Sequence, residues 1–154
     1  MIRVIGIDPG IGITGFGILD GKNGKTRLHS YGTITPPKNQ PIHDRLKYLY
    51  NEAQKLIQTY KPTVMAIEDS FYSKNVKSAL TLGQARGALM LAAANEGIDV
   101  KQYAPRKVKQ SITGNGAATK EQIQFMVTTI LKMKEPPSPL DISDAIAVAL
   151  TYYN

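Results

Sequence analysis

The chain has 154 residues, 42% of them hydrophobic, which is typical of one globular domain. Its 19 lysine and arginine residues outnumber 12 acidic ones, and the net charge of +7 indicates a polyanionic partner, either nucleic acid or an anionic membrane. The absence of cysteine excludes disulfides and thiolate zinc sites, and two histidines are too few for a histidine-rich metal centre. Any metal is therefore expected on carboxylate oxygens, which suits Mg²⁺ or Mn²⁺.

Neither a membrane span nor a secretion signal is expected. No apolar run approaches the roughly 18 residues that a spanning helix needs. The N-terminus also lacks the long apolar segment of a signal peptide. We therefore expect a cytoplasmic protein that does not associate with membranes.

The first third of the chain predicts three short strands. An apolar run over residues 2–8 stops at Pro9-Gly10, which is a turn pair. A second run over residues 14–20 ends at Asp20-Gly21, and a turn at residues 22–25 precedes a third strand over residues 26–35. Short strands separated by turn signals favour an antiparallel meander.

The rest of the chain predicts alternating helices and strands. Helical spacing of apolar residues from Ile42 ends at Lys61-Pro62, and Thr119 to Gln122 form a capping box that opens another helix. We expect helices at 42–60, 75–95, from 119 and at 141–152, strands at 63–68 and 98–103, and a short helix at 106–111. Apart from that short helix, the order βββαβαβαα predicts one α/β domain over residues 1–154, with a five-stranded mixed sheet flanked by helices.

Four carboxylates stand where predicted elements begin or end. Asp8 and Glu68 each close a strand, and Asp141 and Asp144 are expected on one face of the first turn of the last helix. Each has an ordinary explanation when taken singly. Asp8 is typical of a turn, and Asp141 and Asp144 are typical of a helix N-terminus. Glu68 is typical of a solvated strand end, and its neighbour Asp69 competes with it for a role in the site.

The four together indicate a more specific chemistry. Three or four converging carboxylates can hold two Mg²⁺ ions about 3.5–4 Å apart, which is the arrangement used for in-line phosphodiester cleavage. Carboxylates gathered without cations would instead raise one another's pKa. The sequence therefore predicts a site for two divalent ions formed by Asp8, Glu68, Asp141 and Asp144.

Several stretches resemble the RuvC family of Holliday-junction resolvases, and the resemblance covers essentially the whole chain. The most specific part lies between Lys74 and Gly87. The motifs that carry it are Gly6-Ile7-Asp8-Pro9-Gly10 with Thr14-Gly15-Phe16-Gly17; Ala66-Ile67-Glu68 with Phe71, Lys74-Asn75 and Leu82-Gly83-Gln84-Ala85-Arg86-Gly87; Tyr103-Ala104-Pro105 with Val108-Lys109-Gln110 and Gly114-x-Gly116; and Asp141-x-x-Asp144-Ala145-x-Ala147.

The resemblance implies an RNase H-like fold and a homodimer that makes paired nicks in a four-way DNA junction during recombination and repair. It implies that the four carboxylates are metal ligands for Mg²⁺, with Mn²⁺ as a substitute, and that Lys109 and Lys120 are catalytic and lie near the cleaved phosphate. It also implies a branch-migration motor of the RuvA–RuvB kind as a partner. Two departures stand out: Ile11-Gly12 replaces a polar or basic position, and Asp69 adds negative charge beside Glu68.

Further residues are expected to contact DNA. The resemblance makes Phe71 an aromatic that stacks on an unpaired base, with Tyr72 beside it, although adjacent aromatics could also cap the core. Arg106 and Lys107 could be an ordinary solvated face, but their position before a glycine loop favours a phosphate track. The full set is Phe71, Tyr72, Lys74, Arg86, Arg106, Lys107, Lys109 and Lys120.

Gly83 and Gly87 lie four apart within a predicted helix, where each glycine costs about 1 kcal/mol relative to alanine. That cost suggests that another backbone approaches closely. The neighbour could be the sheet of the same chain or the same helix of a partner, and the resemblance favours the dimer.

Two other classes of protein fit part of this pattern. The Gly-Ile-Asp-x-Gly and Thr-Gly-Phe-Gly pattern also resembles the phosphate-binding hairpin of actin and sugar-kinase ATPases, but these enclose ATP between two such domains. A non-catalytic DNA-binding module would explain the charge but not four carboxylates at element ends. A metal-dependent junction endonuclease explains both.

Overall fold

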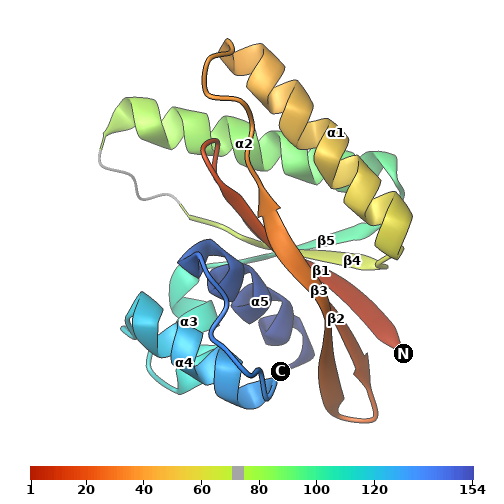
Figure 1. Ribbon diagram of the computed structural model, residues 1–154, viewed down its shortest axis with the longest axis vertical. Coiled ribbons are helices and arrows are strands. Elements are labelled where there is room, and N and C mark those ends of the chain that lie inside the picture. The colour runs from red at the N-terminus through yellow and green to blue at the C-terminus, as the bar shows by residue number, and fades with distance from the viewer. Residues whose placement is uncertain (71–74) are drawn as a thin grey trace.

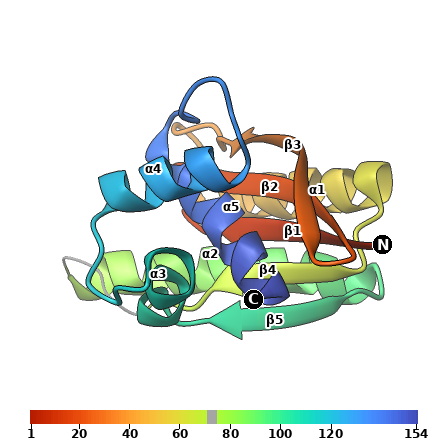
Figure 2. The same cartoon turned by 90° about the horizontal axis from the view of Figure 1, so that it is seen from below.

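A mixed sheet in the order β3-β2-β1-β4-β5 forms the centre of the computed structural model, which describes residues 1–70 and 75–154. Helices cover both of its faces, α1 and α2 on one and α3, α4 and α5 on the other (Figures 1 and 2). The elements are β1 (Ile2–Asp8), β2 (Thr14–Lys22), β3 (Lys25–Ile34), α1 (Ile42–Tyr60), β4 (Val64–Glu68), α2 (Val76–Asn95), β5 (Asp99–Tyr103), α3 (Pro105–Thr113), α4 (Lys120–Ile130) and α5 (Leu140–Tyr153).

The sheet combines the predicted meander with a parallel half. β1 pairs antiparallel with β2 and parallel with β4, and β4 in turn pairs parallel with β5. The turn between β2 and β3 is at Asn23-Gly24, where both residues have positive φ as a tight hairpin requires. The second strand is longer than predicted because Asp20 does not end it: the carboxylate is buried in β2 and pairs with Arg3 at 2.7 Å.

Each face of the sheet has its own hydrophobic core. Ile5, Ile7 and Met65 point toward α1 and α2, and their neighbours Val4 and Ala66 point toward α3, α4 and α5. This alternation along β1 and β4 is the period-two pattern of strands that are covered on both sides. The carboxyl ends of β1 and β4 are therefore held rigidly between two packed layers.

Glycines of the first two strands let α5 lie directly on the sheet. A Cβ at Gly6 would overlap the backbone oxygen of Ala145, and one at Gly17 would lie 2.7 Å from Cγ1 of Ile146. Close packing of α5 on β1 and β2 therefore explains Gly6 and Gly17 of the opening motif.

Helix boundaries agree with the sequence to within a few residues. The short helix predicted at 106–111 is the longer α3, which begins with Pro105 and ends at Gly114 in the left-handed conformation. Asn75 caps α2 by accepting a hydrogen bond from the backbone N–H of Ser78. α5 begins at Leu140, so Asp141 lies in its first turn but Asp144 lies in the second. None of the helices within residues 1–70 and 75–154 is long and apolar enough to cross a membrane.

Candidate active site

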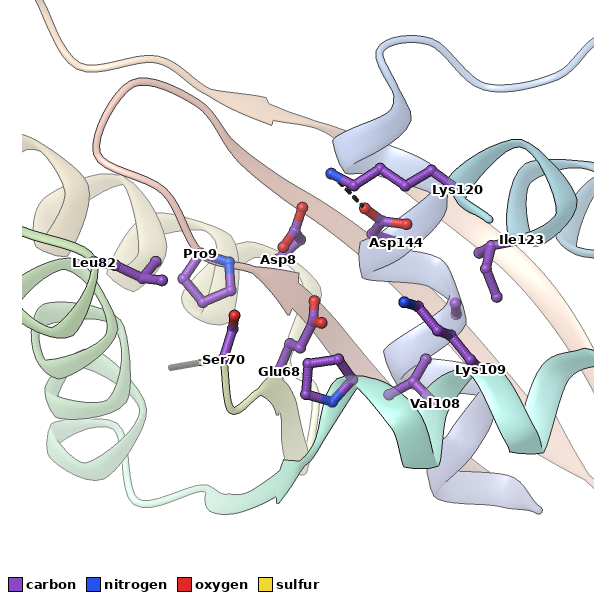
Figure 3. A pocket seen from close by; sticks show the side chains of 12 residues that line it. Asp8, Pro9, Glu68, Ser70, Leu82, Val108, Lys109, Lys120, Ile123 and Asp144 are labelled. Atoms are coloured by element: carbon purple, nitrogen blue, oxygen red, sulfur yellow. Dashed lines mark ion pairs between the residues drawn. The ribbon is translucent and has the colours of Figure 1, made fainter. Parts of the chain in front are cut away.

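Adjacent parallel strands bring Asp8 and Glu68 together at the carboxyl ends of β1 and β4. Ile7 of β1 is paired with Ile67 of β4, so the next residue of each strand emerges at the same level. α5 lies on one face of the sheet with its N-terminal part at this end, and it adds Asp144. The three side chains line one cavity of about 390 Å³, in which Lys109 and Lys120 face them (Figure 3).

Burial and mutual repulsion raise the pKa values of these acids. Burial, followed by the charges of Glu68, Asp144 and Asp141, raises the pKa of Asp8 to about 9. Burial and the charge of Asp144 raise the pKa of Glu68. The pKa of Asp144 is also raised, first by burial and then by Asp141. Their shared upward shift means that the cavity favours added positive charge.

Two lysines supply part of that positive charge. The ammonium group of Lys120, at the start of α4, lies 3.7 Å from Oδ2 of Asp144. Burial alone would lower the pKa of Lys120, but the four carboxylates outweigh it and raise the pKa. Lys109 projects from α3, and its charge lowers the pKa of Glu68 and of Asp144 in opposition to their burial.

Asp141 is half-buried one turn before Asp144, and it acts on the cavity through its charge rather than by lining it. Within the described part of the chain, no three acidic or histidine side chains are already gathered as ligands of one ion. The donors are all hard carboxylate oxygens, which is the chemistry that Mg²⁺ and Mn²⁺ prefer.

The other predicted contact residues differ in where they lie. Arg106 and Lys107 are exposed in the first turn of α3. The side chain of Arg86 is only 12% exposed and bonds to the protein itself. Phe71, Tyr72 and Lys74 lie outside the described residues, so their predicted contacts are not described.

Sequence reasoning missed two residues that brace the loop after Asp8. The hydroxyl of Thr14 donates to the carbonyl of Gly10 at 2.7 Å and accepts from the N–H of the same glycine. Arg45 of α1 donates to the carbonyl of Ile11 at 3.0 Å. Thr14 belongs to the recognised motif, but no local signal marks Arg45, which meets this loop only through the fold.

The sheet is RNase H-like, with acids at the ends of two parallel strands. Acids of the C-terminal helix and two lysines complete the site. This combination defines a nuclease of the resolvase class. The family model of the crossover junction endodeoxyribonuclease RuvC matches residues 4–152. The chain therefore belongs to the RuvC family of crossover junction endodeoxyribonucleases.

Individual relatives agree with this assignment. The crossover junction endodeoxyribonuclease RuvC of Brevibacillus brevis is 44% identical over 151 residues, which is 98% of this chain and 91% of the relative. The structure of Thermus thermophilus RuvC in complex with a Holliday junction substrate is 34% identical with a TM-score of 0.91, over 98% of this chain and 92% of that one. The yeast mitochondrial Holliday junction resolvase Ydc2 has a TM-score of 0.69 at 12% identity and supports the fold alone.

Proposed function

We propose that this protein resolves four-way DNA junctions by paired, metal-dependent hydrolysis of phosphodiester bonds. The observation that carries the proposal is the single cavity lined by Asp8, Glu68, Asp144, Lys109 and Lys120. Its carboxylates suit divalent cations, and its lysines suit a phosphate. The Thermus thermophilus relative was solved with a Holliday junction substrate, and this supports a four-way junction as the DNA that is bound.

The metal ligands in this proposal are Asp8, Glu68, Asp141 and Asp144. Two Mg²⁺ ions, with Mn²⁺ as a substitute, would activate the attacking water and neutralise the leaving 3′ oxygen. The chain's own contribution is to hold the acids on two strand ends and one helix, where they can close around cations with little loss of entropy. Asp8, with a pKa of about 9, must give up its proton before it can ligate.

Lys109 and Lys120 are proposed to contact the phosphate that is cleaved. Each already faces the carboxylates across the cavity, and the Lys120–Asp144 ion pair holds one ammonium group at its mouth. A cation in a partly buried site stabilises negative charge on a pentacoordinate phosphate more strongly than one in water does. Both residues are therefore expected to accelerate the chemical step.

The junction arms would be held by charges around this cavity. Arg106 and Lys107 are exposed at the start of α3, next to Lys109, and suit a phosphate track. Phe71, Tyr72 and Lys74 are proposed as contacts near the unpaired bases, on the basis of the sequence alone. Arg86 is withdrawn from this set because its bonding groups already serve the protein.

A homodimer through α2 would place one active site against each of two strands. Gly83 and Gly87 have open space beside them, so packing onto the sheet of the same chain does not explain them. The exposed apolar residues Val76, Leu80 and Leu91 lie on the same side of the helix as these glycines, and the five positions follow one another at spacings of three or four residues. A stripe with small residues at its centre suits a second copy of α2.

The wider setting is also proposed from the family. Residues 1–154 form one nuclease domain in this proposal. The relatives from Brevibacillus brevis and Thermus thermophilus are bacterial, so we propose the cytoplasm as the place of action and a RuvA–RuvB type motor as the loading partner.

One assay separates the proposed function from its alternatives. A labelled four-way junction and a matched duplex are incubated with the protein, with and without Mg²⁺, and ATP hydrolysis is measured in parallel. We expect symmetric nicks in the junction alone and only with Mg²⁺. ATP turnover would favour the ATPase alternative, and binding without cleavage in either condition would favour a non-catalytic DNA-binding module.

A further inference from the structure

Arg86 connects three elements at the point where the fourth strand delivers Glu68. From α2, its Nε donates to the backbone oxygen of Glu68 at 3.1 Å. Its Nη2 donates to Oε1 of Gln102 on β5 at 2.5 Å and lies 3.2 Å from Oδ1 of Asp69. Acceptors from β4, β5 and the residue after Glu68 therefore share one guanidinium group.

The backbone at this point is fixed from the other side as well. Glu68 is the last residue of β4 in register with Tyr103 of β5. The N–H of Asp69 donates to the carbonyl of Tyr103 at 2.8 Å, which extends the pairing by one residue. Glu68 and Tyr103 are the last register pair of β4 and β5, so the guanidinium group secures Glu68 at the end of the ladder.

The exposure of Arg86 argues against a contact with the DNA backbone. Its side chain is 12% exposed, and reaching a phosphate would require it to leave a charged partner and two oxygen acceptors. A planar guanidinium group with several fixed donors suits such a multiple contact, which a lysine ammonium group cannot reproduce.

The same contacts give Asp69 a role. This carboxylate follows Glu68 directly and would add a negative charge beside the cavity if it were unpaired. Its ion pair with Arg86 compensates that charge and draws it toward α2. Asp69 is therefore a partner of the arginine rather than a competitor of Glu68.

We propose that Arg86, held by Asp69 and Gln102, is a positioning residue that fixes the strand end bearing Glu68 and so sets the geometry of cleavage. This inference rests on the proposed function. It predicts a defect in the rate of cutting rather than in the affinity for the junction, because none of the three groups needs to touch DNA.

The test compares Arg86→Gln with Arg106→Gln, which makes the same substitution at an exposed arginine near the cavity. Junction affinity and its salt dependence are measured without divalent metal, and the cleavage rate is measured in single turnover with saturating protein and Mg²⁺. We expect Arg86→Gln to cut bound junction about 10- to 100-fold more slowly, with affinity and salt slope unchanged. Arg106→Gln should show the signature of a lost phosphate contact instead, with weaker binding and a salt slope smaller by about 1.

Two further variants keep the test decisive if Arg86→Gln does not fold. Arg86→Lys retains the charge but loses the fork, and it should recover only part of the rate. Asp69→Asn removes a negative charge near DNA, so binding should be equal or tighter while cleavage slows. Combining Asp69→Asn with Arg86→Gln should slow cleavage no further than the arginine variant alone, as expected for groups that act together.

The outcomes are distinct from those for the proposed function. A wild-type chain that does not cut junctions with Mg²⁺ refutes the proposed function. The wild type could instead cut normally while Arg86→Gln, or Arg86→Lys in its place, binds less tightly with a smaller salt slope and a normal cleavage rate. In that case Arg86 is a DNA contact and the positioning role is wrong. An unchanged rate for Asp69→Asn would likewise overturn the role given to that residue.

Discussion

Gly15 lies directly beneath the backbone of Asp141, so close that a methyl group added to the glycine would overlap the backbone oxygen of the aspartate. This contact joins the opening motif to the C-terminal acids, 126 positions apart in the numbering. The height of α5 above the sheet, and hence the position of Asp141 and Asp144 relative to Asp8, depends on the absence of a side chain at this point.

Gly15→Ala is therefore expected to lift α5 from the sheet. Overpacking of this kind costs about 1–3 kcal/mol of unfolding free energy, which thermal or urea unfolding measures. Cleavage of bound junction should slow as well, because Asp141 and Asp144 move with the helix. Gly12→Ala is the matched control: nothing lies within 4 Å of its added Cβ, and its stability should be nearly unchanged. Equal stability for both variants would show that α5 adjusts freely.

The four carboxylates should be required for cutting but not for binding. Asp8→Asn, Glu68→Gln, Asp141→Asn and Asp144→Asn each remove a metal ligand and also relieve repulsion of the DNA phosphates. We expect cleavage to be abolished while junction affinity, measured without divalent metal, is equal or tighter. Asp99→Asn, a change at a carboxylate that is 71% exposed, should cut normally. A single variant of the four that cuts at the normal rate would remove that residue from the site.

Much of this arrangement could be predicted from the sequence because it depends on local signals. Strand ends at Asp8 and Glu68 and the helix start near Asp141 follow from hydrophobic periodicity and turn residues, and the element order predicts a mixed sheet. The order of the strands and the parallel pairing of β1 with β4 then bring Asp8 and Glu68 to the carboxyl ends of neighbouring strands.

What the sequence could not predict depends on contacts between distant residues. Arg86 was expected on DNA because a basic residue in a recognised motif suggests a phosphate, but only the fold reveals its acceptors on β4 and β5. Asp20 was expected to end a strand, yet a partner at Arg3 allows it to be buried within one. The bracing of the loop by Arg45 likewise has no signal near it in the chain.

The raised pKa of Asp8 predicts how the stability of the metal-free protein depends on pH. The ordinary pKa of an aspartate is 3.8 and that of Asp8 in the folded protein is about 9, so the folded state binds the proton more tightly than the unfolded state. The penalty of this group is therefore absent below about pH 4, grows as pH rises and is complete above about pH 9. Asp8→Asn should stabilise the metal-free protein progressively across this window.

Thermal unfolding of the two proteins in EDTA at several pH values measures this difference. Addition of Mg²⁺ should then raise the melting temperature of the wild type at pH 8 more than that of Asp8→Asn, because the cation replaces the proton on Asp8. A gap between the two proteins that does not change with pH would contradict the raised pKa.

The exposed side of α2 should determine the oligomeric state. Gly83→Leu fills the open space at the centre of the stripe and should prevent close approach of a second α2, so sedimentation at micromolar concentration should show a dimer for the wild type and a monomer for the variant. Phe125→Leu changes another exposed apolar residue, 68% exposed on α4, and should leave the dimer intact. A monomeric wild type would contradict the proposed interface.

The basic residues near the cavity should divide between binding and chemistry. Lys107 is exposed in the first turn of α3, whereas Lys109 and Lys120 line the cavity. A lysine that neutralises the phosphate in the ground state contributes affinity and about one unit of salt slope. One that meets charge developing in the transition state raises the rate without raising affinity.

Lys107→Ala should accordingly weaken junction binding with a salt slope smaller by about 1. Lys109→Ala and Lys120→Ala should mainly slow the cleavage of bound junction, by about 10²–10³-fold, in single turnover with saturating protein. If both cut bound junction at the normal rate and only bind less tightly, they belong with Lys107 to a phosphate track and not to the active site.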